Sequence, residues 1–133
     1  MKINGKHFRT IWIKKDDSSV IQVIDQRFLP HEVIIEDLKD VDAVATAIKE
    51  MHIRGAGLIG AAAGYGMYLA ALYAPRHSEE DFMSAILNAG ERLKATRPTA
   101  VNLEWAVNRS LEAIKTEKDF NDKIAAARRI AQT

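Results

Sequence analysis

The sequence contains no cysteine, which excludes disulfides, thiolate metal sites and a cysteine nucleophile within its 133 residues. Net charge is also nearly absent, because 19 basic and 18 acidic side chains leave a formal charge of +1. A basic field of the kind that attracts nucleic acid or anionic lipid is therefore missing. The first ten residues lack the apolar block of a secretory signal. These absences predict a cytoplasmic protein that does not bind nucleic acid.

Long runs of strongly apolar residues are missing as well. Residues 56–74 carry no charge and are about as long as a membrane-spanning helix. They are mainly alanine and glycine, so the free energy of transfer into lipid would be marginal. The composition favours a helix buried within protein over a membrane span.

Three short stretches near the start of the sequence have the composition of strands, at residues 10–14, 20–25 and 32–35. Polar turn residues separate the first two, and a proline-containing turn at 29–31 separates the second and third, which predicts an antiparallel meander. A sheet this small needs helices packed on it. Its expected apolar contributors are Ile11, Ile13, Val20, Val23, Val33 and Ile35.

Helical periodicity replaces the strand pattern after Asp37. The first predicted helix is capped by Asp37 or Asp40, and its apolar face comprises Val41, Val44, Ala45, Ile48 and Met51. The second spans about residues 58–74 and is ended by Pro75, and small residues at Gly60 and Gly64 would allow neighbouring backbones to approach closely.

Three further helices are predicted in the second half of the chain. A capping-box-like start at 78–81 opens the third, with Phe82, Ile86, Ala89 and Leu93 directed inward. Thr99 is the expected cap of the fourth, whose apolar stripe is Leu103, Val107, Leu111 and Ile114. The fifth pattern, Phe120, Ile124, Ala127 and Ile130, is still running at Thr133, which suggests that the natural element continues.

Together these elements predict an α+β fold in which a small three-stranded antiparallel sheet packs on a bundle of about five helices. We expect a single domain over residues 1–133, with the sheet within 10–36 and the helices within 40–132.

The glycines at positions 55, 57 and 60 match G-x-G-x-x-G, the motif of dinucleotide-binding sites. That site needs a strand before the glycines and a parallel strand after the helix, whereas helical patterns stand on both sides. Glycines ahead of a helix still expose unpaired N–H groups beside the positive end of its dipole, and Arg54 adds a fork suited to phosphate oxygens. The alternative is that the glycines only turn the chain while Arg54 pairs with a surface carboxylate.

Arg97 repeats this arrangement, because it precedes Pro98 at the start of the fourth helix. Two arginines at two helix starts could clamp one phosphate, and Asn102 could bond a ligand hydroxyl. The alternative is that Arg97 covers the end of the preceding helix, where a cation is also favourable.

Other candidate residues favour structural roles. The histidines at positions 7, 31, 52 and 77 have no ligand spacing with one another, so no metal site is predicted. Asp25 is expected to close a local ion pair with its neighbours. Trp12 and Trp105 are expected to anchor a core or an interface.

Several motifs occur in the order and spacing found in methylthioribose-1-phosphate isomerases, and the sequence resembles this family from about residue 10 to its end. The family is homologous to regulatory subunits of eukaryotic initiation factor two B and to archaeal ribose-1,5-bisphosphate isomerases. The motifs are Thr10-Ile11-Trp12, Ile24-Asp25-Gln26-Arg27 with Leu29-Pro30, Ala47-Ile48 with Met51 and Arg54-Gly55-Ala56, and Arg97-Pro98-Thr99-Ala100-Val101-Asn102-Leu103 with Trp105-Ala106.

The resemblance implies an N-terminal sheet-plus-helix domain joined to a larger Rossmann-like domain, with a phosphorylated pentose held between them. By position it transfers binding roles to Arg54, Gly55, Ala56 and Arg97. The implied reaction is the aldose–ketose isomerisation of methionine salvage, which needs no metal or organic cofactor. The family usually has proline and alanine where Gly57 and Leu58 stand here, and losing that proline loosens the backbone of the binding loop.

The catalytic cysteine and aspartate of the family belong to the larger domain, which this sequence lacks. The resemblance therefore implies no catalytic residue here, and we expect the chain alone to be inactive because binding groups without an acid or base lower a barrier little. A separate chain carrying the catalytic domain, or a second copy forming a homodimer, are the expected protein partners. The alternative is a non-enzymatic interaction or dimerisation module like the initiation-factor relatives.

Overall fold

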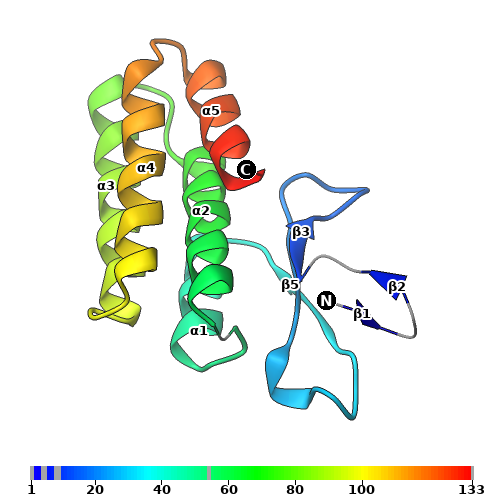
Figure 1. Ribbon diagram of the computed structural model, residues 1–133. Coiled ribbons are helices and arrows are strands. Elements are labelled where there is room, and N and C mark those ends of the chain that lie inside the picture. The colour runs from blue at the N-terminus through cyan, green and yellow to red at the C-terminus, as the bar shows by residue number, and fades with distance from the viewer. Residues whose placement is uncertain (1, 4–5, 8–9, 54, 133) are drawn as a thin grey trace.

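The computed structural model describes residues 2–3, 6–7, 10–53 and 55–132, and it is an α+β fold in which helices and sheet lie side by side (Figure 1). The strands are β1 Lys2–Ile3, β2 Lys6–His7, β3 Ile11–Ile13, β4 Ile21–Ile24 and β5 Ile35–Leu38, with a 3₁₀ turn at Gln26–Phe28. The helices are α1 Val41–Lys49, α2 Ala56–Tyr73, α3 Glu79–Thr96, α4 Val101–Thr116 and α5 Phe120–Gln132. The predicted fold class is thereby confirmed.

The main sheet is the predicted antiparallel meander, in the order β3-β4-β5. β1 and β2 form a second, two-stranded antiparallel pair that the sequence pattern did not predict. Every strand pair within the described residues is antiparallel, and α1 precedes the glycine run. The G-x-G-x-x-G pattern therefore lacks the parallel frame that a dinucleotide site requires.

The third strand lies three residues later than predicted, at Ile35–Leu38 instead of 32–35. A turn closed by the hydrogen bond from Glu32 N to Phe28 O takes up the start of this segment, and pairing begins with Ile35 opposite Ile24. The expected inward positions Val33 and Ile35 are consequently wrong, since both are exposed. Leu38 is the residue of this strand that enters the core.

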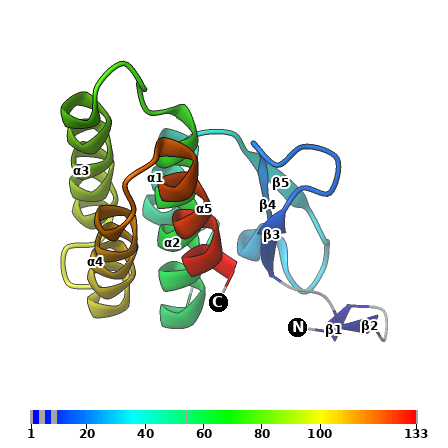
Figure 2. The same ribbon diagram turned by 90° about the horizontal axis from the view of Figure 1, so that it is seen from above.

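Helix α2 is the centre of the bundle, and α1, α3, α4 and α5 surround it (Figures 1 and 2). Residues 62–69 are all buried, which explains an uncharged helix with no polar face. An added Cβ at Gly60 or Gly64 would lie 3.4 Å from the backbone of Asn102 or Ala131, so the predicted close approaches are confirmed. Among the described helices, none has the length and apolar character required to span a membrane.

Helices α1 and α3 are capped by side chains. Asp40 Oδ1 accepts a hydrogen bond from Ala43 N at 2.7 Å, so Asp40 and not Asp37 is the cap of the two that were predicted. Ser78 Oγ accepts one from Asp81 N at 3.1 Å, as predicted. Met51, in contrast, lies beyond the end of α1 with a φ of 64° and an exposed side chain, so its assignment to the buried face is wrong.

Helix α4 does not have the predicted cap. Ala100 takes the N-cap position in place of Thr99, because Ala100 N donates to Arg97 O and closes a turn that moves the helix start one residue along the chain. Neither α4 nor α2 has a side-chain hydrogen bond at its N-cap. The N-termini of α1 and α3 thus have a side-chain cap, and those of α2 and α4 do not. The N-termini of α2 and α4 are called the open helix starts below.

Candidate functional site

The open helix starts lie at the same end of the bundle, since α2 and α4 run side by side in the same direction (Figure 1). Gly60 in the second turn of α2 touches Asn102 in the first turn of α4. Both starts therefore present first-turn N–H groups and the positive ends of their dipoles to one region of the surface. This is the arrangement in which backbone groups bind an anion.

Gly55 forms the N-cap of α2 with a φ of 92°, a conformation that side chains other than glycine rarely adopt. Space around it is open, because an added Cβ would meet no atom within 4 Å. The glycine is thus required by the backbone angle and not by crowding. It leaves the first turn of α2 accessible from outside.

Arg97 lies at the C-cap of α3 and is half-buried. Its Nε donates to Ile48 O at the end of α1, 3.3 Å away, so the arginine does cover a helix end, as the alternative interpretation expected. Within the described residues its two terminal nitrogens meet no hydrogen-bond or ion-pair partner. The same side chain can therefore hold the bundle together and present its two terminal NH₂ groups to a ligand.

A pocket of about 420 Å³ lies at this end of the bundle. Arg97 and the start of α4 form most of its wall, and Ile59 of α2 closes one side. Its lining is Ile59, Arg97, Thr99, Ala100, Val101 and Asn102. The pocket combines one guanidinium, one amide side chain and an uncapped helix start, which suits a phosphorylated small molecule.

The two remaining predicted site residues are Arg54 and Ala56. Arg54 lies outside the described residues, so its predicted convergence with Arg97 stays a prediction. Ala56 is the first residue of α2, next to Gly55. Sequence reasoning thus led to Gly55 and Arg97 at two neighbouring helix starts.

A cluster of three polar side chains had no signal in the sequence. Asp25, Glu36 and His52 come from three separate elements, and one oxygen or nitrogen atom of each lies within 4.8 Å of the others. His52 Nδ1 is 2.7 Å from Glu36 Oε2, and Gln26 N donates to His52 O at 2.8 Å. These bonds tie the segment that leads to Gly55 to the sheet.

The donor types of this cluster suit a divalent cation, but Asp25 already has a cationic partner. Arg27 Nη2 lies 2.7 Å from Asp25 Oδ2, and both Arg27 Nε and the Arg27 backbone N–H donate to the same carboxylate. The predicted local ion pair of Asp25 is thereby confirmed. The guanidinium supplies the positive charge that a cation would bring, so the cluster serves to hold the loop.

Asp25 should make stability depend on pH. The hydrogen bonds from the Arg27 side chain hold the pKa of this buried carboxyl below its ordinary value of 3.8, although burial opposes them. Since folding lowers the pKa, the stabilisation is present above pH 3.8 and is lost as pH falls through the lower folded value. Asp25→Asn should reduce the free energy of unfolding by about 1–3 kcal/mol at pH 7, and by less at pH 2.5, where the unfolded carboxyl is protonated.

Urea unfolding of both proteins at the two pH values measures this difference. Asp122→Asn, at an exposed position on α5, is the matched control and should change little at either pH. A variant Asp25→Asn that is equally destabilised at both pH values would contradict the ion pair as the cause.

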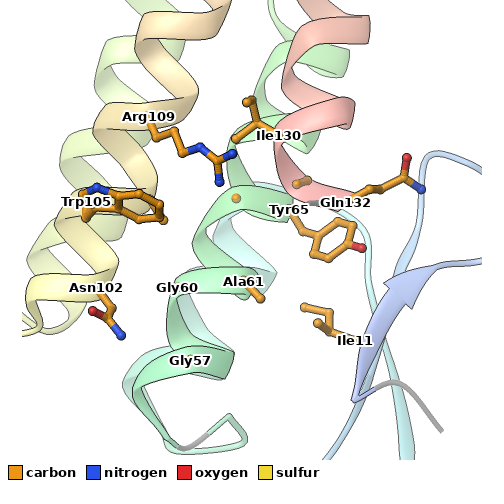
Figure 3. A pocket seen from close by; sticks show the side chains of 13 residues that line it. Ile11, Gly57, Gly60, Ala61, Tyr65, Asn102, Trp105, Arg109, Ile130 and Gln132 are labelled. Atoms are coloured by element: carbon orange, nitrogen blue, oxygen red, sulfur yellow. The ribbon is translucent and has the colours of Figure 1, made fainter.

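A groove of about 390 Å³ opens beside α2, on the face where α4 and α5 flank it (Figure 3). Trp105 and Arg109 extend from α4 on one side, and Ile130 and Gln132 from α5 on the other. Trp105 is 62% exposed, so it is no core anchor in this structure. Sequence reasoning named Trp105 but missed Arg109 and the groove.

Comparison with known proteins gives one family. A sequence model described as the Initiation factor 2 subunit family matches residues 52–133, well over half of the chain. The matched part begins at His52 and includes both open helix starts, the pocket and most of the groove.

Curated relatives and solved structures agree with this match. The chain is 45% identical over 127 residues to the methylthioribose-1-phosphate isomerase of Paramagnetospirillum magneticum, covering 96% of this chain and 33% of that protein. It has a TM-score of 0.86 to two solved structures. One is 5-methylthioribose 1-phosphate isomerase from Pyrococcus horikoshii, 39% identical, with 96% of this chain and 35% of that one covered. The other is the translation initiation factor eIF-2B delta subunit from A. fulgidus, 30% identical, with 95% and 36% covered. The chain thus spans about a third of the length of the relatives it matches.

Proposed function

Because this chain belongs to the Initiation factor 2 subunit family, we propose that it is the N-terminal, sugar-phosphate-binding domain of a methylthioribose-1-phosphate isomerase-like protein. The ligand would be a phosphorylated pentose whose phosphate lies at the starts of α2 and α4. Arg54, Gly55, Ala56 and Arg97 would bind it, and the whole of residues 1–133 would act as one domain.

The observation that supports this proposal best is the difference among the helix starts. Asp40 and Ser78 cap α1 and α3, whereas the two adjacent starts beside Arg97 have no side-chain cap. A phosphate there would accept hydrogen bonds from first-turn N–H groups and from the guanidinium together. Asn102 lines the same pocket, and its side-chain amide could accept a hydrogen bond from a sugar hydroxyl or donate one to it.

Binding and chemistry are separate in this proposal. An aldose–ketose isomerisation moves a proton between two carbons and needs a positioned acid and base. The described lining of the pocket contains an arginine, a threonine and an asparagine but no carboxylate or imidazole. The proton-transferring groups would come from the two thirds of the family's chain that lie outside the matched part, so we expect no turnover by this chain alone.

Titration of this chain with methylthioribose-1-phosphate, followed by backbone amide NMR shifts, tests the proposal. The amides of residues 55–60 and 97–102 should shift, while those of β3 and β4 should not. Inorganic phosphate should shift the same backbone amides but leave the side-chain NH₂ signals of Asn102, which would contact a sugar hydroxyl, less affected. Shifts elsewhere, or none at millimolar ligand, would overturn the proposed binding role.

Substitution of Arg97 provides the matched functional test. Arg97→Ala should weaken binding about tenfold to a hundredfold, the loss expected for a charge-assisted hydrogen bond. Arg97→Lys should recover part of that loss, since it keeps the charge without the planar fork. Arg128→Ala, which removes an exposed arginine from α5, should bind like the unaltered chain.

The resemblance to the A. fulgidus delta subunit supports a second candidate, a non-enzymatic interaction module. Its similarity over 95% of this chain matches that of the isomerase in TM-score but is lower in identity. The titration separates the two candidates. If sugar phosphate causes no amide shifts and the chain dimerises in sedimentation experiments, the interaction module is favoured.

A further inference from the structure

The connection between α1 and α2 has an unusual backbone conformation. Met51 has a φ of 64° and Gly55 a φ of 92°, so two residues four positions apart are left-handed. Glycine adopts this conformation readily, but in methionine it brings the side chain into steric conflict with the backbone. The Met51 side chain is exposed, so its own burial does not offset that strain. Strained residues persist where surrounding contacts fix them, and they are concentrated at ligand-binding segments.

His52 provides such contacts. It is only 8% exposed, although it lies in a connection between two helices. Its Nδ1 is 2.7 Å from Glu36 Oε2 on β5, and its carbonyl oxygen accepts a hydrogen bond from Gln26 N at 2.8 Å. With a proton on Nδ1, the ring donates to the carboxylate whether the imidazole is neutral or charged. The connection is thus bonded to the sheet side of the molecule through both the side chain and the main chain of one residue.

The end of α1 joins this connection to the arginine of the pocket. Ile48 O accepts a hydrogen bond from Arg97 Nε, and the preceding carbonyl, Ala47 O, accepts one from Ile53 N, each at 3.3 Å. Ile53 is fully buried. Consecutive carbonyls of one helix end therefore hold the guanidinium and the segment that leads to Gly55. The separation between the guanidinium and the start of α2 is set by these bonds and by those of the connection.

We propose that His52 is a positioning residue of the anion-binding site, which holds the first turn of α2 beside Arg97 through its side-chain and main-chain hydrogen bonds. His52 is not among the residues that line the pocket, so it would act on a ligand only through the backbone that follows it. Backbone N–H groups bind an anion best when they are ordered beforehand, because ordering them on binding lowers the affinity. The ligand rests on the proposed function, whereas the hold on α2 does not.

Hydrogen–deuterium exchange of the chain without ligand tests the hold on α2. Ile59 N donates to Gly55 O at 2.9 Å, in the first turn of that helix. His52→Leu removes the ring donor but keeps an apolar side chain in the buried site. Exchange at Ile59 should become about tenfold faster, as expected for local opening of a helix end. Leu69, in the buried middle of the same helix, is the internal control, and its exchange should rise much less.

Three further variants separate the bond from the bulk of the side chain. His52→Asn should keep the exchange at Ile59 near its original rate, because the asparagine amide can supply an N–H donor in place of the ring. Glu36→Ala should reproduce the effect of His52→Leu, and the two changes together should do little more than either alone, as expected for partners in one bond. His77→Leu is the matched control, since it removes a histidine that pairs with the carboxylate of Asp81 at the exposed start of α3.

The affinity for ligand tests the consequence for the site. The amide titration gives dissociation constants for methylthioribose-1-phosphate and for inorganic phosphate. His52→Leu should raise both by about tenfold although the residue lies outside the pocket, and His52→Asn should recover most of the loss. His77→Leu should bind both compounds like the unaltered chain.

Two results would contradict the positioning role. Exchange that rises equally at Ile59 and Leu69 would show that His52 only stabilises the domain as a whole. A loosened first turn of α2 with unchanged affinity would show that the turn does not limit binding. If the unaltered chain binds neither compound while exchange at Ile59 responds as expected, the proposed ligand is rejected and the hold of His52 on α2 is supported, so the two ideas fail separately.

Discussion

Replacing Phe82 with alanine is expected to lower the free energy of unfolding by about 3–5 kcal/mol, the usual cost of emptying a buried phenylalanine site. Phe82 is fully buried in the first turn of α3. Its ring packs on that of Phe120 at the start of α5, with centroids 5.1 Å apart and planes inclined by 39°. The substitution therefore leaves a cavity and loosens the contact between two helices.

Urea unfolding followed by circular dichroism measures the loss. It amounts to a large share of the roughly 5–15 kcal/mol that holds a domain folded. Leu87→Ala is the matched control, since Leu87 lies on the same helix with its side chain 44% exposed. Its cost should stay below about 1 kcal/mol. Equal losses at the two positions would show that Phe82 is not a core residue.

Replacing Gly90 with leucine is expected to cost about 2–3 kcal/mol through overpacking. A Cβ at this position would lie 2.9 Å from Val107 Cγ1 on α4, and the valine is itself fully buried. A branched side chain on a helix has almost no rotamer freedom, so it cannot move aside. The two helices would have to separate.

Gly57→Ala is the comparison, because an added Cβ there meets nothing within 4 Å. That change should raise the free energy of unfolding by up to about 1 kcal/mol, since alanine favours the helix. Val107→Ala should recover part of the loss in the Gly90 variant, which thermal unfolding of the double variant measures. Additive losses would mean that the Val107 contact is not the cause.

Local signals predicted most of the fold. The cap Ser78 and the stripe of Phe82, Ile86 and Leu93 depend on residues three or four apart and were correct, and Asp40 was one of two predicted caps for α1. Errors arose at irregular turns, whose hydrogen bonds are just as local but leave no hydrophobic periodicity in the sequence. The turn closed by Glu32 N and Phe28 O shifted the third strand, and the turn closed by Ala100 N and Arg97 O displaced the expected cap.

The candidate site was predictable only in part. Arginine and glycine at a helix start have a recognisable pattern, which led to Gly55 and Arg97. The pairing of His52 with Glu36 could not be inferred, since 16 residues and a change of element separate them. Arg109 was missed for a similar reason. Its significance comes from an adjacent groove that α2, α4 and α5 build together.

The absence of a side-chain cap at α2 and α4 limits which substitutions these helix starts can accept. A serine or aspartate introduced at position 100 would supply α4 with an internal acceptor, as Ser78 does for α3, and would make the helix more self-sufficient. The same oxygen would occupy the N–H groups that an incoming anion needs. A capping side chain at position 55 is disfavoured for a second reason, because residues with a side chain rarely adopt the φ of 92° found there. Under the proposed function, intrinsic helix stability and anion affinity would therefore compete for the same few backbone hydrogens.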